Sequence, residues 1–402
     1  MADRKDRDMD YEAHKNKYHD IREERRLAKK KAKRKRVLSV IAVVIIVVIG
    51  FATKEYWMPQ VAEFFEDKTE TIINDGTPEK GNGFPISLSQ SVYNYVTSVK
   101  GMPTVISDTH ITMYNDKGGV HKKIQHMFAN PVYYTMEDKL FIYDLDGQRF
   151  AVYDKKGEVY NNKTETPIVV AAASQDGKVA IVTQTDKHMS FLTIYDEGGE
   201  EIFKWSGGQR IVNVSFNDNE DGCIISTFSA SGGKIVSRLY GLEFDKTTET
   251  FKTSELEGLV YKSGYCSNGD MWLLGDSILY RVASDGSVLY TYKYDRELVA
   301  YELSGEIAVL VFDSVTGEKQ EIRIFGKSKE PSVYKTETNV IKLEIIDNSA
   351  VFMTKKLFAF LDENAKIKAS AELEKEYSDF AVTEEEAYFM GYNEIDKIGF
   401  ER

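Results

Sequence analysis

The chain has 402 residues, a formal net charge of −12, 42% hydrophobic residues and only two cysteines. This length is enough for one large or two medium domains with a real hydrophobic core, and the cysteine count excludes a disulfide-stapled scaffold. Residues 1–36 carry 15 Lys/Arg and 8 Asp/Glu, a net charge of +7, which leaves −19 for residues 37–402. Such an acidic remainder argues against binding to DNA or RNA, whose phosphates would repel it.

The first predicted element is a basic tail over residues 1–36. Ten Lys/Arg lie between positions 22 and 36, directly before an apolar stretch. A basic cluster at this place predicts contact with anionic lipid headgroups. Tyr11, His14 and Tyr18 follow heptad spacing, so a short coiled coil is the alternative to a solvated helix that orients the apolar stretch.

The apolar stretch over residues 37–53, VLSVIAVVIIVVIGFAT, predicts a transmembrane helix. Its 17 uncharged residues would extend about 26 Å as a helix, close to the thickness of a bilayer core. Tyr56 and Trp57 follow where interfacial aromatic residues lie, and the Lys/Arg excess before the stretch predicts a cytoplasmic N-terminus and an exported C-terminal part. A signal peptide cleaved near Gly50 is the alternative, but 36 preceding residues are more than a usual n-region contains.

Residues 54–83 read as a juxtamembrane segment and linker. Pro59 interrupts any continuing helix, and turn residues such as Gly76 and Gly81 follow without periodicity.

From residue 84 to residue 402 the pattern is all-β and repetitive. Short runs of β-branched and aromatic residues alternate with polar residues and stop at Asp, Gly or Asn, and one weak helical pattern lies around residues 370–376. A strand, an Asp-type turn with Gly and a second strand recur, as in the segments FAVYDKKG (150–157) and LTIYDEGG (192–199). The residue that ends the first strand falls at 114, 153, 195, 244, 282, 325, 361 and 400, in steps of 39, 42, 49, 38, 43, 36 and 39.

A period near 40 residues with four short strands per unit is the β-propeller pattern. The recurring hairpins are the expected outer pair of each blade, and the inner pairs precede them, for example residues 131–135 with 140–143, 168–173 with 179–183, and 340–346 with 350–353. The last unit stops after three strands, and a spare strand over residues 85–90 precedes the first unit. We therefore predict eight blades with a composite closing blade. Seven blades is the alternative, if the degenerate copy at residues 241–247 is an insertion.

Several residues are candidates for chemical sites. His110, His121, His126 and His188 do not converge at the spacing of a zinc site. Residues 217–222 (NDNEDG) start like a calcium loop, but Phe228 stands where the bidentate Glu is required, so a hairpin turn is the preferred interpretation.

Cys223 and Cys266 are expected to be free buried thiols, with a single bridge as the alternative. The 56 carboxylates in residues 37–402 offer no pair with a distinguishing context. We predict no catalytic, cofactor-binding or metal-binding residue.

With its basic tail, single span and hairpins at Tyr153-Asp154 and Tyr195-Asp196, the chain resembles an uncharacterised family of single-pass, membrane-anchored β-propeller proteins from Firmicutes, mostly clostridial relatives. The hairpins also resemble those of quinoprotein-type and outer-membrane-assembly propellers, but the tryptophan-rich docking motif of those groups is missing. The resemblance implies a propeller and supplies no functional residues.

These observations predict a membrane-tethered, extracytoplasmic scaffold without enzymatic activity or cofactor, which binds a protein or a component of the cell envelope. The alternative is a hydrolase or lyase acting on glycans, with carboxylates from three or more blades and tyrosines at the channel mouth. A sensor that signals through dimerisation of the span is a third hypothesis.

Overall fold

The computed structural model describes residues 83–88, 93–184, 188–313, 319–383 and 386–399. The predicted basic tail (1–36), membrane span (37–53) and juxtamembrane segment (54–83) lie outside these ranges, apart from Gly83. Within the described ranges, no helix has the length and apolar character that a membrane crossing requires.

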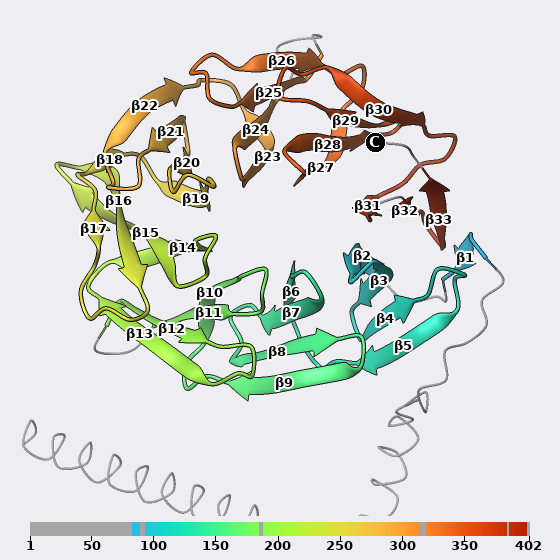
Figure 1. Cartoon of the computed structure of the whole chain (residues 1–402), viewed down its shortest axis with the longest axis horizontal. Helices are drawn as coiled ribbons and strands as arrows, with labels where there is room; N and C mark the ends of the chain where they lie inside the picture. Colours follow the sequence, from blue (N-terminus) through green and yellow to red (C-terminus); the bar gives the residue numbers. More distant parts are fainter. Residues whose placement is uncertain (1–82, 89–92, 185–187, 314–318, 384–385, 400–402) are drawn as a thin grey trace, which may run out of the picture. The chain divides into compact units, whose positions relative to one another are not determined.

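The described residues form an eight-bladed β-propeller, in which antiparallel sheets surround an axis (Figure 1). Each blade starts at its innermost strand and proceeds outward. Blade 1 consists of β2 (Tyr93–Val99), β3 (Met102–Ser107), β4 (His110–Tyr114) and β5 (Val120–Gln125). Blade 2 consists of β6 (Pro131–Thr135), β7 (Lys139–Asp144), β8 (Arg149–Asp154) and β9 (Gly157–Lys163). Blade 3 consists of β10 (Ile168–Ala173), β11 (Val179–Thr183), β12 (Ser190–Tyr195) and β13 (Glu201–Gly207).

Blade 4 has five strands: β14 (Arg210–Phe216), β15 (Gly222–Ser231), β16 (Lys234–Glu243), β17 (Phe251–Lys252) and β18 (Leu256–Glu257). Blade 5 consists of β19 (Val260–Tyr265), β20 (Met271–Gly275), β21 (Ile278–Val282) and β22 (Val288–Lys293). Blade 6 consists of β23 (Leu298–Ser304), β24 (Ile307–Phe312), β25 (Glu321–Phe325) and β26 (Ser332–Lys335). Blade 7 consists of β27 (Val340–Ile346), β28 (Ser349–Thr354), β29 (Leu357–Leu361) and β30 (Ile367–Glu372).

Blade 8 is built from both ends of the domain. Its inner three strands are β31 (Asp379–Val382), β32 (Glu386–Met390) and β33 (Glu394–Gly399), and its outer strand is β1 (Ile86–Ser87). β1 pairs antiparallel with β33, with Ile86 opposite Ile395. The composite eighth blade is therefore confirmed, although β1 is shorter than the predicted strand over residues 85–90, of which 89 and 90 lie outside the described residues.

The strand pairing also decides the predictions on strand pairs, blade number and helix content. The predicted inner and outer pairs are confirmed, and the degenerate copy at residues 241–247 belongs to blade 4, so the seven-blade alternative is wrong. The helix predicted from the weak pattern at residues 370–376 is not formed. Ser370 lies in β30, where alternate residues are exposed, because pairing with β29 overrides local helix propensity.

The recurring Asp closes the outer hairpin of the blades. In blade 3, Asp196 Oδ1 accepts hydrogen bonds from the backbone N–H groups of Gly198 and Glu200, both at 2.9 Å. Asp362 does the same in blade 7 for Asn364 and Lys366, at 2.9 and 2.8 Å. A short carboxylate that bonds to its own backbone is the physical reason for Asp at this position.

The recurring Gly has a second role, in the joint between blades. A Cβ on Gly199 of blade 3 would lie 2.7 Å from the ring of Tyr160, which belongs to the outer strand of blade 2. In the same way, a Cβ on Gly286 of blade 5 would lie 2.7 Å from the ring of Phe251 in blade 4. The outer strand of one blade thus packs into the space left by the turn glycine of the next.

The hydrophobic core is divided among the interfaces between neighbouring blades. One cluster joins blades 8 and 1 and includes Val96, Tyr114, Tyr388 and Ile395, all of which are buried. Comparable clusters occupy the other blade-to-blade interfaces. Because each blade is buried by its neighbours, the ring is stabilised as a unit.

Candidate functional site

The turns at one end of the ring surround a cavity of ≈ 1130 Å³, which we call the acidic mouth. Its lining comes from blades 1, 2, 3, 7 and 8 and consists of Ser98, Lys100, Gly101, Asp116, Glu137, Asp138, Gln175, Asp176, Glu197, Ile346, Asp347, Val382, Thr383 and Glu386. Seven of these residues carry carboxylates and only one is a lysine. The cavity therefore favours cationic ligands.

Tight turns place most of these side chains: Lys100, Asp138, Asp176 and Asp347 lie in turns between the two inner strands of a blade, and Asp116 and Glu197 in turns between the two outer strands. Lys100 and Gly101 have φ values of 51° and 75°, and Asp347 and Asn348 have φ values of 48° and 54°. Two consecutive residues with positive φ form the turn type that best matches the twist of a two-stranded hairpin. The charged residues are thus held at the tips of short hairpins and not on long loops.

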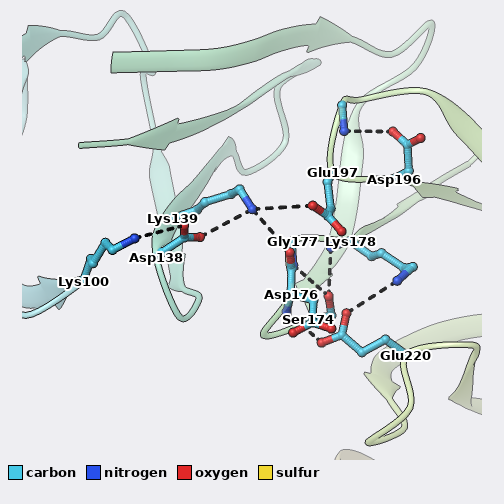
Figure 2. A network of polar contacts seen from close by, with 11 residues as sticks. Lys100, Asp138, Lys139, Ser174, Asp176, Gly177, Lys178, Asp196, Glu197 and Glu220 are labelled. Atoms are coloured by element: carbon cyan, nitrogen blue, oxygen red, sulfur yellow. Dashed lines mark hydrogen bonds and ion pairs between the residues drawn. The ribbon is translucent and has the colours of Figure 1, made fainter. Parts of the chain in front are cut away.

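A polar network links the turns of blades 1 to 4 (Figure 2). The Nζ of Lys100 lies 3.9 Å from Asp138 Oδ2, and Asp138 Oδ1 lies 3.4 Å from Lys139 Nζ. Lys139 in turn donates to the backbone carbonyl of Asp176 at 3.3 Å and lies 3.9 Å from Glu197 Oε2. The lysines therefore fix the positions of the turns while the surplus of negative charge remains.

Glu220 of blade 4 is the buried member of this network. Its side chain is buried, and its Oε1 accepts a hydrogen bond from the backbone N–H of Asp176 at 2.8 Å. Its Oε2 lies 3.7 Å from Lys178 Nζ. Ser174 Oγ closes the same turn by accepting hydrogen bonds from Gly177 and Lys178 N–H groups at 3.2 and 2.8 Å. The Asp176 turn is thus organised before any ligand arrives.

A second charged group lies deeper, on the innermost strands of blades 7 and 8. Lys342 Nζ lies 2.8 Å from Glu344 Oε1 and 2.5 Å from Asp379 Oδ1, and it donates to the carbonyl of Phe380 at 2.7 Å. Burial raises the pKa of Glu344 above its ordinary value in spite of the neighbouring lysine. Burial also opposes the charge of Lys342, but Glu344 and Asp379 raise its pKa.

Asp379 connects this group to blade 1. Its Oδ2 accepts a hydrogen bond from the backbone N–H of Val96 at 2.9 Å, and its side chain is buried. Lys342 of blade 7, Asp379 of blade 8 and Val96 of blade 1 therefore form a clamp across the joint where the ring closes. We call this group the closure clamp.

The four candidate histidines do not converge on one point, and the ring of His188 lies 6.4 Å from that of Phe191, measured between centroids. His110 Nδ1 lies 2.9 Å from Thr109 Oγ1, His121 Nε2 lies 3.2 Å from the carbonyl of Lys155, and His126 Nε2 lies 2.9 Å from the carbonyl of Ser107. In the part of the chain that the structure describes, no three His, Cys, Asp or Glu side chains form a group that could hold a metal ion.

The other candidate residues have structural roles. Residues 217–222 form the turn between β14 and β15, in which Asn217 Nδ2 donates to Asp221 Oδ1 at 2.7 Å. Cys223 and Cys266 are free and buried, and burial raises the pKa of the Cys266 thiol to about 12.

The alternative hypothesis expected carboxylates from three or more blades at the channel mouth, but no individual residue of the acidic mouth was predicted. Acidic residues at the turns between inner strands, such as Asp138, Asp176 and Asp347, recur at corresponding positions of different blades. That recurrence is a usable signal once the strands have been assigned to blades.

Comparison with solved structures places the fold among known propellers. Sqt1 of Saccharomyces cerevisiae aligns with a TM-score of 0.59 and 10% identity, over 81% of this chain and 100% of Sqt1. BamB of Moraxella catarrhalis aligns with a TM-score of 0.50 and 10% identity, over 81% of this chain and 100% of BamB. Sqt1 of Chaetomium thermophilum, bound to the N-terminus of the ribosomal protein L10, aligns with a TM-score of 0.53 and 10% identity, over 80% of this chain and 100% of that one.

At these identities the likeness shows the fold alone. No curated protein sequence is significantly similar to this chain. A protein-family model, in contrast, matches residues 64–400, which include all the described strands. The chain belongs to the DUF5711 family, a family of unknown function.

Proposed function

We propose that this protein is a membrane-tethered, extracytoplasmic scaffold without enzymatic activity, whose acidic mouth binds a basic segment of a partner protein. The observation that carries the proposal is a single cavity lined by seven carboxylates and one lysine. Lys139 and Lys397 also pair with carboxylates of this lining, and the group stays negative after both are counted. Carboxylates gathered in a concave, partly desolvated surface attract cations more strongly than the same charges spread over a flat surface. Lys and Arg side chains can also donate several hydrogen bonds each to such a site.

The fixed positions of the turns around the mouth favour binding over catalysis. The turns are held by their own lysines and by the buried Glu220, so little ordering is left for the moment of binding. A propeller of this fold can hold a segment of a partner chain, as Sqt1 of Chaetomium thermophilum does with the N-terminus of the ribosomal protein L10.

The tether and its orientation rest on the sequence. The uncharged stretch over residues 37–53 follows ten Lys/Arg, which predicts a cytoplasmic tail on anionic lipid and a propeller on the other side of the membrane. Residues 54–83 then link the span to the ring.

Crosslinking and affinity capture from native membranes test this function. The full-length protein is compared with a variant lacking residues 1–36 and with the triple variant Asp116→Asn, Glu137→Gln, Asp176→Asn, which removes three charges from the mouth. We expect a specific partner that is captured without the tail, is lost with the triple variant and is released by salt. Glu165→Gln, in the connection between β9 and β10 at the opposite end of the ring, removes one exposed carboxylate outside the mouth and serves as a control.

Recovery of the same partners by the triple variant would contradict the role of the mouth. Loss of the partner on removal of residues 1–36 alone would assign the interaction to the tail.

A glycan-acting hydrolase or lyase is the second candidate, because carboxylates from five blades line the mouth. Glu302 and Glu344 are not part of the lining of the mouth but lie on the innermost strands β23 and β27, where burial raises the pKa of both, as would suit a general acid. No tyrosine lines the described mouth, although tyrosines were expected there with the carboxylates. Release of reducing ends from cell-wall glycans, lost with Glu344→Gln and retained with Glu165→Gln, would establish the enzyme and replace the scaffold.

A further inference from the structure

A second cavity of ≈ 500 Å³ lies between blades 4 and 5, which are adjacent in the ring (Figure 1). Two irregular features of the sequence meet there. The first is the Asn-rich turn over residues 217–222, and the second is the degenerate repeat whose strands β16 and β17 carry Leu242, Glu243 and Phe251. Its volume is within the roughly 300–1,000 Å³ of ordinary small-molecule sites.

One wall of this cavity is polar and comes from three hairpin turns. Asn217 makes the side-chain hydrogen bonds that hold the blade 4 turn together. Asp218 and Asn219, at the tip of this turn, are exposed. Asn268 and Asp285 come from the two turns of blade 5. Together these amide and carboxylate groups supply both hydrogen-bond donors and acceptors, which a ligand rich in hydroxyl groups requires.

The other wall is aromatic and rigid. The ring of Phe251 lies between two glycines, because a Cβ on Gly241 would approach it to 2.4 Å and a Cβ on Gly286 to 2.7 Å. Tyr265 lines the same cavity, and burial raises the pKa of its hydroxyl, which therefore stays a neutral hydrogen-bond donor. A fixed aromatic surface opposite a polar surface matches a ring that has an apolar C–H face and a hydroxyl-bearing edge.

The charges of the lining exclude several other ligands. Asp218, Glu243 and Asp285 line the cavity, and its described lining contains no Lys or Arg. Phosphates, uronic acids and other anions would be repelled. A metal ion is also disfavoured, since no group of three potential ligands capable of holding one occurs among the described residues.

We propose that this cavity binds a short, uncharged saccharide. The turn residues Asp218, Asn219 and Asn268 would bond to its hydroxyl groups, and Phe251 and Tyr265 would contact the ring face. The cavity shares no lining residue with the acidic mouth, so the proposal does not depend on the proposed function. It would give the scaffold a second contact, with a glycan.

Saturation-transfer NMR on the full-length chain in lipid nanodiscs tests the proposal, because glycoside detergents would compete for the site. The probes are chitotriose, maltotriose and cellotriose as uncharged saccharides and trigalacturonate as an anionic one, each with and without EDTA. We expect transfer to at least one uncharged probe and none to trigalacturonate. The double variant Asp218→Ala, Asn219→Ala should weaken binding about tenfold, and Tyr265→Phe somewhat less.

The double variant Glu363→Ala, Asn364→Ala, in an exposed turn of blade 7, should bind like the parent and controls for folding. The triple variant of the acidic mouth should also bind saccharide normally, which separates the two sites. Absence of transfer to all three uncharged probes would overturn the proposal. So would equal binding of trigalacturonate, loss of binding with EDTA, or binding that the variants at Asp218 and Tyr265 leave unchanged.

Discussion

The closure clamp predicts that one buried carboxylate stabilises the whole ring. Asp379 lies on the inner strand of the composite blade, where it is only 6% exposed. Its two oxygens bind Lys342 of blade 7 and the backbone N–H of Val96 in blade 1, so both neighbours of blade 8 depend on it. The substitution Asp379→Asn keeps the shape of the side chain but removes its charge. It also turns an amide N–H₂ toward one of the two donors.

The size of the effect follows from these contacts. Removing one partner of a buried ion pair costs about 3–5 kcal/mol, because the other charge stays buried without compensation. Lys342 keeps Glu344 at 2.8 Å, so the lower end of that range, about 3 kcal/mol, is expected. For a domain of this size such a loss lowers the melting temperature by about 4–5 °C.

Differential scanning calorimetry on the full-length protein measures this change. The matched control is Glu376→Gln, which breaks the exposed pair between Lys355 and Glu376 at 3.1 Å and should cost at most about 0.5 kcal/mol. The double variant Lys342→Met, Asp379→Asn should lose less stability than the two single variants together, because their effects are coupled. A melting temperature for Asp379→Asn that equals that of the control would refute the clamp.

Three further predictions concern the joints of the ring and its response to acid. Gly199→Ala should lower the free energy of unfolding in urea by about 1–3 kcal/mol, because φ is +84° and the new Cβ would meet the ring of Tyr160. Gly208→Ala, with open space around it, should be neutral. Equal effects of the two substitutions would disprove the joint. Deletion of residues 84–91, which removes β1, should lower the single thermal transition of the whole domain, and an unchanged transition would show that β1 does not close the ring. Burial opposes the ionisation of Glu321, but two arginines hold its pKa below the ordinary 4.5, so its contribution to stability is present at neutral pH and lost as the pH falls. The free-energy difference between the parent and Glu321→Gln should therefore shrink as the pH falls below about 4.5, and a constant difference would contradict this assignment.

The architecture was predictable because the repeat has a local cause. Asp196 and its counterparts close a hairpin through their own backbone, and Gly199 leaves space for Tyr160 of the preceding blade. The Asp or Asn of this turn recurs in blades 1, 2, 3 and 7, and the glycine that meets an aromatic ring of the preceding blade recurs in blades 3 and 5, so the units appear in the sequence as a period. The composite blade was predictable because the last unit lacked one strand and the first had one too many.

The candidate sites were not predictable for a related reason. The acidic mouth gathers side chains from blades 1, 2, 3, 7 and 8, and the correspondence between Asp138 and Asp347 shows only after the strands have been assigned to blades. The cavity between blades 4 and 5 lies at the irregular repeat. In the sequence, the irregular spacing around Phe251 cannot be told from the loss of a repeat motif that has no function. The short length of β1 likewise depends on its partner strand, because only Ile86 and Ser87 pair with β33.

Site-specific photo-crosslinking in native membranes tests the central claim most directly. A photoreactive amino acid is placed at Glu137 in the acidic mouth or at Glu165 at the opposite end of the ring. The binding of a basic partner at the mouth predicts one discrete crosslinked product from Glu137, which high salt removes, and none from Glu165. No product from Glu137, or the same product from both positions, would contradict that binding mode.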